Sequence, residues 1–433
     1  MTHPAVSMLK VWAACILLYA VLPFHLVDKH LTVQGFVVLF LYLSAFCLGT
    51  LMVAPLKRVP AAAQRIDFST TEALLAAASV VTVVALLFDL RDKSVFDLAE
   101  AYDLRSDQAS ALMEGSASAS SLGFQIGFLT YPAAYVYLVR AIIFERRPNL
   151  TRLVGFGVLP VLMATVAMGG RAPLLYAILI SLFALGARKV FFPRQDLGRT
   201  RQRRLGPLAW SLIGVSIVGA LYYFIAVFFT RAEVVGGAPG MFKVAEEIWG
   251  IGFRGPVADL MFKALGDEVT YVVFIFNWYV VQGLVMGNFL FSDYHGPMQL
   301  GVYGVDLVSA LMRRLDGTLV ARNFDALQQL GTYGFLPSAF GSLYVDLWFF
   351  GILVTGAWGA LTGLVYQRIR STRDSRWLVF APFVTMGILF SFINTPIGFS
   401  NGLVTHLWML IAFLSARRLK VRRSGPILIG SPA

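Results

Sequence analysis

The sequence predicts an all-α polytopic membrane protein, and two observations carry that prediction. Hydrophobic residues make up 58% of the 433 residues and charged residues only 14%, and the mean hydropathy is +0.71. Ordinary globular proteins are much less apolar. Apolar stretches of about 20 residues, the length that a helix needs to cross about 30 Å of hydrocarbon, also recur along the chain. Helices are expected in these stretches because lipid offers their backbone groups no other partners.

About ten transmembrane helices are expected, within a single membrane domain over residues 1–433. The first apolar run has no small-residue cleavage site after it, so a retained helix is expected there. Two outer segments accompany the spans, a first one over residues 91–121 and a large loop over residues 230–339. The predicted spans are 11–27, 33–56, 70–90, 122–144, 153–168, 172–187, 208–229, 340–366, 377–393 and 401–416.

The basic residues indicate the orientation of these spans. Of the 36 Lys and Arg, 24 fall on one side, in clusters such as "RKVFFPRQDLGRTRQRR" and "RRLKVRR", and 12 fall on the other. The positive-inside rule makes the first side the cytoplasm, which places both termini there. The net charge of +12 therefore reflects membrane orientation, and a nucleic-acid partner is not predicted.

Each outer segment contains an additional predicted helix. The apolar piece 271–291 is long enough to span, but a full span there would place the basic "QRIRSTRDSR" outside. A re-entrant or in-plane helix is therefore expected at 271–291. In the first outer segment, Val95, Phe96, Ala99 and Tyr102 recur at helical spacing, which predicts a short helix on the outer surface.

Motifs for metal or nucleotide chemistry are absent from the sequence. It contains no Gly-rich phosphate loop, no HExxH, no CxxC pair and no DxD. Neither a tightly held metal nor a cofactor is therefore predicted. The two cysteines, Cys15 and Cys47, lie inside apolar runs and predict no disulfide framework.

Arginines predominate among the outer basic residues, by eight to four over lysine. A guanidinium is always charged and presents a planar fork of donors, which suits a diphosphate held without a metal. An anionic group is therefore expected at the outer membrane boundary. The outer arginines are Arg91, Arg105, Arg171, Arg231, Arg254, Arg313, Arg314 and Arg322.

Three of these arginines have informative surroundings. In "GGRAP", two glycines permit a tight turn and Pro173 suits the first turn of a helix, so Arg171 is predicted at a hairpin tip. Arg231 follows the apolar "FIAVFFT", and Arg254 lies among aromatic residues that suit sugar rings. The alternatives are an anchor in the lipid headgroups for Arg171 and Arg231, and an aromatic belt around Arg254.

Candidate general bases occur in the large outer loop. They are His295, Asp306 and Glu268, in that order, because imidazole and carboxylate groups can accept the proton of an acceptor hydroxyl. Asp267 is a rival beside Glu268. For each of them, a structural or solvated role is the alternative.

Three further residues are candidates for substrate contact. Tyr303 and Tyr333 lie in Gly-rich stretches of the outer loop. Asp346 falls in the first turns of the predicted span 340–366, where a carboxylate is costly unless it faces a cavity or a cation. Asp346 is therefore predicted either to contact substrate or to pair with one of the arginines.

The chain resembles the Wzy-type O-antigen or oligosaccharide repeat-unit polymerases of bacterial inner membranes. The resemblance is carried by "AYDLR" in the first outer segment, "MGGRAPLL" between two spans, and "TYGFLPSAFGSLYVDLWFFG" after the long outer loop. It implies a GT-C-like, metal-independent glycosyltransferase in the inner membrane, with its active site facing the periplasm. It also implies that Arg105, Arg171 and Arg322 correspond to arginines that serve the substrate.

The resemblance further implies the reaction and the partners. A growing O-antigen or exopolysaccharide chain would pass from undecaprenyl diphosphate to a lipid-linked repeat unit, among membrane lipids and with a chain-length regulator protein as a partner. The alternatives are an O-antigen ligase, a transporter or flippase for lipid-linked oligosaccharides, and a structural scaffold. A transporter is expected to carry charges along the middle of several spans, whereas Glu72, Asp89 and Arg140 lie near span ends.

Overall fold

The computed structural model supports the predicted fold class. It describes residues 2–27, 29–53, 66–91, 121–145, 148–168, 170–191, 222, 225–230, 232–316, 324–332, 334–371 and 374–418. Within these residues, nine helices or helix groups are long and apolar enough to cross a membrane. The predicted helix in 91–121 and most of the predicted span 208–229 lie outside the described residues.

Most predicted spans agree with the observed helices to within a few residues. Six candidate spans are continuous or nearly so: α1 (Pro4–Val21), α2 (Val33–Met52), α3 (Ser69–Leu90), α9 (Ala172–Phe191), α12 (Pro256–Asp293) and α16 (Phe350–Ser371). The other three combine shorter helices: α5 (Leu122–Thr130) with α6 (Pro132–Phe144); α7 (Leu150–Leu153) with η1 (Val154–Val158) and α8 (Leu159–Ala167); and η2 (Ser375–Phe380) with α17 (Ala381–Leu389) and η3 (Phe390–Phe392).

The remaining described elements are shorter. They are the helices α11 (Gly237–Glu247), α13 (Asp306–Leu315), α15 (Ser338–Leu347) and α18 (Gly402–Ser415), and four short strands. Strand β1 (Phe24–Leu26) pairs antiparallel with β3 (Ile251–Phe253), and β2 (Ile66–Asp67) pairs antiparallel with β4 (Arg417–Arg418). The orientation predicted from the sequence places both strands of each sheet at the same side of the membrane.

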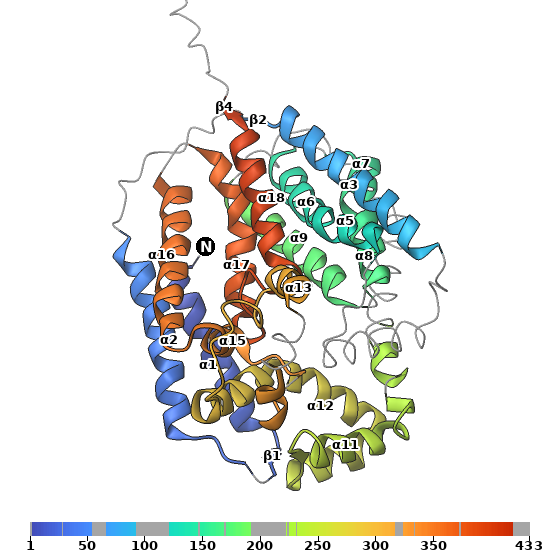
Figure 1. Ribbon diagram of the computed structural model, residues 1–433, viewed down its shortest axis with the longest axis vertical. Coiled ribbons are helices and arrows are strands. Elements are labelled where there is room, and N and C mark those ends of the chain that lie inside the picture. Colours follow the sequence, from blue (N-terminus) through green and yellow to red (C-terminus); the bar gives the residue numbers. More distant parts are fainter. Residues whose placement is uncertain are drawn as a thin grey trace, which may run out of the picture.

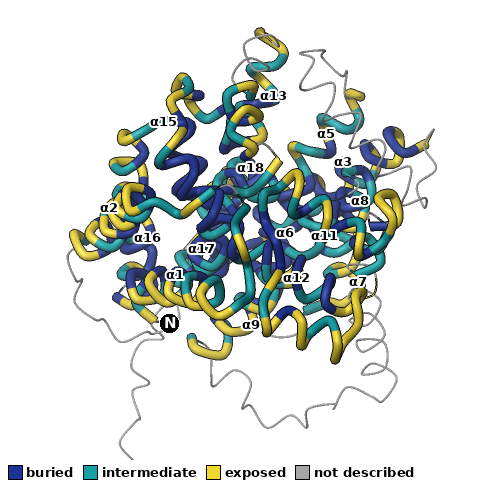
Figure 2. Tube along the Cα trace, turned by 90° about the horizontal axis from the view of Figure 1, so that it is seen from below, coloured by how far each residue is buried: buried dark blue, intermediate teal, exposed yellow. Residues whose placement is uncertain are grey.

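The helices form an upright group with a layer across one end. In Figure 1, α2, α16, α17 and α18 run roughly upright, whereas α12 and α11 lie across the lower part of the molecule beside β1. Strands β2 and β4 lie at the opposite, upper end. Figure 2 shows the buried residues gathered inside this group and the exposed ones on its outer surfaces.

Helix α12 packs against segments that the sequence places toward the outer side. The Asn288 amide donates to the carbonyl of Thr32 just before α2, and the Cys15 thiol of α1 donates to the Val280 carbonyl. A Cβ at Gly283 would lie 1.8 Å from the Phe392 carbonyl oxygen at the end of η3. These contacts place α12 across the other helices near one end of the bundle.

Two predicted spans are wrong in their boundaries. The first was expected at 11–27, but α1 ends at Val21 because Pro23 cannot continue a helix, and β1 follows. The single span expected at 340–366 is two helices, α15 and α16, separated at Trp348, which has a φ of 49°. The Trp348 carbonyl accepts the Tyr42 hydroxyl at 2.6 Å in addition to the Gly351 N–H at 3.0 Å.

Helices α2 and α16 approach each other closely through small residues, as the GxxxG spacing of "GALTG" predicts. A Cβ at Gly359 would lie 2.2 Å from the Phe46 carbonyl oxygen, and one at Gly363 would lie 2.7 Å from that of Thr50. Only glycine permits this contact, so the two helices pack through this motif.

The charged residues near the predicted inner ends of the spans form one ion-pair network. The side chain of Arg140 is 4% exposed and pairs with Glu72 at 3.2 Å and with Glu145 at 2.5 Å. Arg152 pairs with the second oxygen of Glu72 at 3.0 Å. Arg188 donates to the carbonyl of Glu145. The network thus joins α3, α6, α7 and α9.

Arg140→Met is expected to lower the free energy of unfolding by about 3 kcal/mol, because two carboxylates lose a buried partner. Unfolding in detergent, followed by tryptophan fluorescence, measures the change. The matched control is Arg152→Met, which removes a side chain that is 61% exposed and should cost less than about 1 kcal/mol. Equal losses of stability in both variants would contradict the conclusion that burial of Arg140 makes its ion pairs more important than that of Arg152.

Candidate functional site

A cluster of polar side chains lies where several helices begin or are interrupted. The segments that meet are the α5–α6 junction, the start of α13 and the stretch between η3 and α18. We call this group the central polar cluster. Its members are Tyr131, Tyr135, Asp306, Ser400 and Asn401.

The α5–α6 junction exists because of Pro132. Proline has no N–H, so the carbonyl of Phe128 loses its helical partner. The Asn401 amide donates to this carbonyl, and the Trp408 indole donates to the carbonyl of Leu129 at 2.9 Å. The Asn401 side chain thus satisfies the carbonyl that Pro132 frees, as apolar surroundings require, and Trp408 adds a bond to the next carbonyl.

The stretch before α18 is also non-helical. Ser400 and Asn401 have φ angles of 50° and 57°, in the left-handed region that is uncommon outside glycine. The Tyr131 hydroxyl donates to the Ser400 carbonyl at 3.0 Å. The Tyr135 hydroxyl lies 3.0 Å from the Ser400 hydroxyl and donates to the Pro173 carbonyl at 3.2 Å. These bonds hold Ser400 and Asn401, the two residues with left-handed backbone angles, between α6 and α9.

Asp306 brings a carboxylate to this cluster. It is the first residue of α13, and its carboxylate accepts the backbone N–H of Asn401. In Figure 1, α13 lies beside the lower end of α18. The residue is exposed at its surface, although many protein atoms lie around its carboxylate. This loss of bulk solvent raises the pKa of Asp306 to about 6, against the opposing effects of the Asn401 N–H and of Arg313.

The cluster lies below the ends of the neighbouring helices. The Thr82 hydroxyl of α3 donates to the Thr130 hydroxyl, next to Tyr131, at 2.8 Å. Thr82 precedes the last residue of α3, Leu90, by eight positions, which corresponds to about 12 Å of helix. The cluster therefore lies about two helical turns from the end of α3.

Asp346 anchors the loop that leads into α13. Its side chain is buried, and its carboxylate accepts the backbone N–H of Tyr303 at 3.0 Å and that of Gly304 at 2.9 Å. The sequence predicts an arginine partner or a substrate for this carboxylate. The donors that the structure shows are backbone N–H groups, which no local pattern in the sequence suggests.

Asp346→Ala is expected to lower the free energy of unfolding by about 2–3 kcal/mol, because two buried N–H groups lose their acceptor. Asp346→Asn keeps one acceptor oxygen and should cost about half as much. Thermal unfolding in detergent distinguishes the two variants. If both variants unfolded at the wild-type temperature, the anchoring role would be wrong.

Arg171 lies at the predicted hairpin between α8 and α9. Its guanidinium is 4.0 Å from the centroid of the Phe228 ring. The Leu175 N–H donates to the Arg171 carbonyl, which begins the α9 helix. Two residues beyond Arg171, the Pro173 carbonyl accepts from Tyr135. The hairpin is therefore joined to the central polar cluster through the start of α9.

Tyr303 belongs to the loop that Asp346 anchors. Its hydroxyl donates to the Phe335 carbonyl at 3.5 Å, while its backbone N–H bonds to Asp346. The Val305 N–H donates to the Gly301 carbonyl and closes this turn. Tyr303 thus lies three residues before Asp306, at the entrance to α13.

Three other candidates lie outside the central polar cluster. Arg254 follows β3, is exposed and forms an ion pair with Glu246. His295 is exposed in the turn after α12, and Glu268 is exposed on α12 itself. Asp267, the rival of Glu268, is exposed beside it. The candidates that lie outside the described residues are Arg105, Arg231, Arg322 and Tyr333.

Sequence reasoning missed most members of the cluster. Tyr131 and Tyr135 lie inside an apolar run, where a tyrosine carries no functional signal. Ser400 lies between two predicted spans and Asn401 is the first residue of the second, so the pair resembles an ordinary loop at the start of a helix. The available signals were Pro132 within a span and the polar, Gly- and Pro-containing stretch "NTPIGFSNG".

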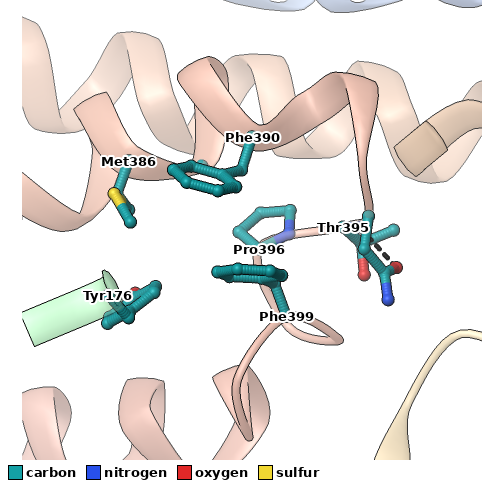
Figure 3. A pocket seen from close by; sticks show the side chains of 8 residues that line it. Tyr176, Met386, Phe390, Thr395, Pro396 and Phe399 are labelled. Carbon is teal, nitrogen blue, oxygen red and sulfur yellow. Dashed lines mark hydrogen bonds between the residues drawn. The ribbon is translucent and has the colours of Figure 1, made fainter. Parts of the chain in front are cut away.

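A small hollow adjoins the cluster. Figure 3 shows Tyr176, Met386, Phe390 and Phe399 around it, with Pro396 and Thr395 at one side. The ring of Tyr176 is 4.8 Å from that of Tyr135. This lining is mainly aromatic and apolar, so the hollow is suited to packing and not to binding a charged group. No group of three or more His, Cys, Asp or Glu that could hold a metal occurs among the described residues.

Comparison of the chain with known protein families, curated proteins and solved structures finds no match. A functional proposal therefore rests on the geometry of the site and on the pattern of the sequence.

Proposed function

We propose that the protein is a polysaccharide polymerase of the membrane. It would transfer a growing glycan from a polyprenyl diphosphate to the sugar of a lipid-linked repeat unit, on the side of the large loop. The observation that carries this proposal is the position of Asp306, whose carboxylate bonds to Asn401 in a polar cluster that the Arg171 hairpin adjoins.

The chemistry needs a base and a stabiliser of negative charge. A hydroxyl oxygen of the acceptor attacks the anomeric carbon of the donor, and the bond from that carbon to the diphosphate oxygen breaks. The acceptor proton passes to the Asp306 carboxylate, which a pKa near 6 leaves mostly ionised at neutral pH. The diphosphate leaves with the bonding electrons, and a guanidinium such as that of Arg171 stabilises its charge.

The packing of α12 supports the placement of this reaction at the membrane surface. In this proposal, α12 lies in the membrane plane along the outer ends of α1, α2 and η3, as the sequence predicts for 271–291. The basic "QRIRSTRDSR" then stays on the cytoplasmic side. The loop from α12 to α13 then lies on the outer side, opposite the cytoplasmic side, and places Asp306 in the cluster from there.

Incubation of the purified protein with polyprenyl-diphosphate-linked repeat units tests the proposal. The expected result is a ladder of glycans that grows with time and forms in the presence of a chelator. Transfer of the glycan only to a lipid A core would indicate the ligase instead. No transfer to either acceptor would rule out both enzymes.

A carrier for lipid-linked oligosaccharides is the second candidate, and one observation favours it. Tyr131 lies at the interruption between α5 and α6, and its hydroxyl bonds to Ser400 in the non-helical stretch between η3 and α18. Discontinuous helices at a polar site are typical of transporter binding sites. Movement of labelled lipid-linked oligosaccharide across proteoliposomes, without growth of the glycan, would support this candidate over the polymerase.

A further inference from the structure

The first part of α12 has three distinct faces. Ala258 is fully buried, and the ring of Phe262, four residues later, lies 5.1 Å from that of Phe242 in α11. Ala258 and Phe262 form the face toward the protein, because positions four apart lie on one side of a helix. Gly266, with a φ of 75°, separates this part from the rest of α12.

A second face is charged. Asp259 and Lys263 are exposed and stand four residues apart, so they share one side of the helix. The neighbouring helix α11 likewise exposes charge, since Lys243 and Glu247 form an exposed ion pair at 3.8 Å. This charged side of the layer is suited to water or to lipid headgroups.

The third face is apolar and uncovered. Val257 is 52% exposed and Leu260 is 66% exposed, and Ala264, exposed as well, stands four residues after Leu260. The exposed apolar surface continues past Gly266 with Val269 and Phe276, seven residues apart. A stripe of this kind, in water, would be a large uncovered apolar surface of the sort that soluble proteins avoid.

We infer that the face of Val257, Leu260 and Ala264 lies in the lipid leaflet on the side of the large loop. This helix has one face against protein, one charged face and one uncovered apolar face. Such a helix fits a position at the boundary between protein, water and lipid. The chain also carries helices apolar enough to cross a bilayer, and a bilayer around those helices would lie beside this layer. This position of α12 in the lipid leaflet does not depend on which substrate the protein transfers or carries.

Single cysteines on the two exposed faces test this inference. Both native cysteines, Cys15 and Cys47, are first replaced by serine. Leu260→Cys and Ala264→Cys probe the apolar face, and Asp259→Cys and Lys263→Cys probe the charged face. Each variant is spin-labelled, reconstituted into vesicles of phosphatidylethanolamine and phosphatidylglycerol, and exposed to oxygen, which enters lipid, or to a water-soluble nickel chelate.

Labels on the apolar face should collide with oxygen several-fold more often than with the chelate, and labels on the charged face should show the reverse. Equal access of the chelate to both faces would overturn the inference. Spin–spin broadening at 260 and 264 that vanishes on dilution with unlabelled protein would identify a second copy as the occupant and overturn it too. Ala264→Cys changes little volume, so it remains informative if Leu260→Cys misfolds.

Discussion

Asp306→Asn is expected to reduce glycan transfer by roughly 10²–10⁴-fold, the usual contribution of a general base. An amide has nearly the shape of the carboxylate, and its oxygen can still accept the Asn401 N–H. The variant therefore loses the proton acceptor but keeps the local structure. Initial rates of ladder formation measure the effect. The matched control is Asp259→Asn, which changes an exposed carboxylate on α12 outside the cluster and should leave the rate within about twofold of wild type.

The pH dependence separates a base from a merely structural carboxylate. The wild-type rate should rise with pH and level off above about 6, the pKa of Asp306, because only the ionised form accepts a proton. Asp306→Asn should lack this rise. Folding raises the Asp306 pKa, so any stability from this group is present below its ordinary pKa of 3.8 and is lost as the pH rises through about 6.

It follows that Asp306→Asn should be at least as stable as the wild type at pH 8. A loss of activity that came with a matching loss of stability would contradict the catalytic role. An unchanged rate with an unchanged pH profile would remove Asp306 from the mechanism and leave His295 and Glu268 as the remaining candidates.

Arg171→Ala is expected to abolish the polymer while single lipid-linked repeat units are still made. Loss of one fixed donor to a developing negative charge costs roughly 10²–10³-fold in rate. Arg171→Lys keeps the charge but loses the planar fork, so it should recover only part of the activity. The length distribution of the glycan chains measures both variants. Chains of normal length in Arg171→Ala would support the headgroup anchor instead.

A structural contribution of Arg171 needs its own control, because the guanidinium packs on Phe228 at 4.0 Å. Phe228→Leu removes that ring and should cost about 1 kcal/mol of stability. It leaves the guanidinium in place, so the polymer should still form. If Phe228→Leu and Arg171→Ala lost the polymer equally, packing and not charge would explain the effect.

The sequence predicted much of the fold but only part of the candidate site. Apolar runs located α2, α3, α9 and the α5–α6 pair closely, because each run is a local property of the chain. The chain's pattern also nominated Asp306, Tyr303, Asp346 and Arg171 as chemistry-bearing residues. It did not nominate Tyr131 or Ser400, because a hydroxyl in or between apolar helices has no local signature.

The errors also have physical causes. The expected span 340–366 is broken at Trp348, where Tyr42, 306 positions earlier in the chain, supplies the hydroxyl that bonds its carbonyl. For Asp346 the sequence predicted contact with an arginine or a substrate and did not anticipate the backbone N–H groups of Tyr303 and Gly304 that bond to it. Neither bond can be anticipated from neighbours along the chain.

The sequence by itself determined that this protein is a bundle of apolar helices of membrane-spanning length, with basic residues concentrated in particular loops. Lipid imposes length, apolarity and charge placement on each segment separately, so these properties can be read segment by segment. Only the tertiary structure decided where the helices break and which polar groups meet. Those features depend on hydrogen bonds between distant segments, such as Tyr131 with Ser400 and Asn401 with Asp306, in surroundings where every freed backbone group must find a partner.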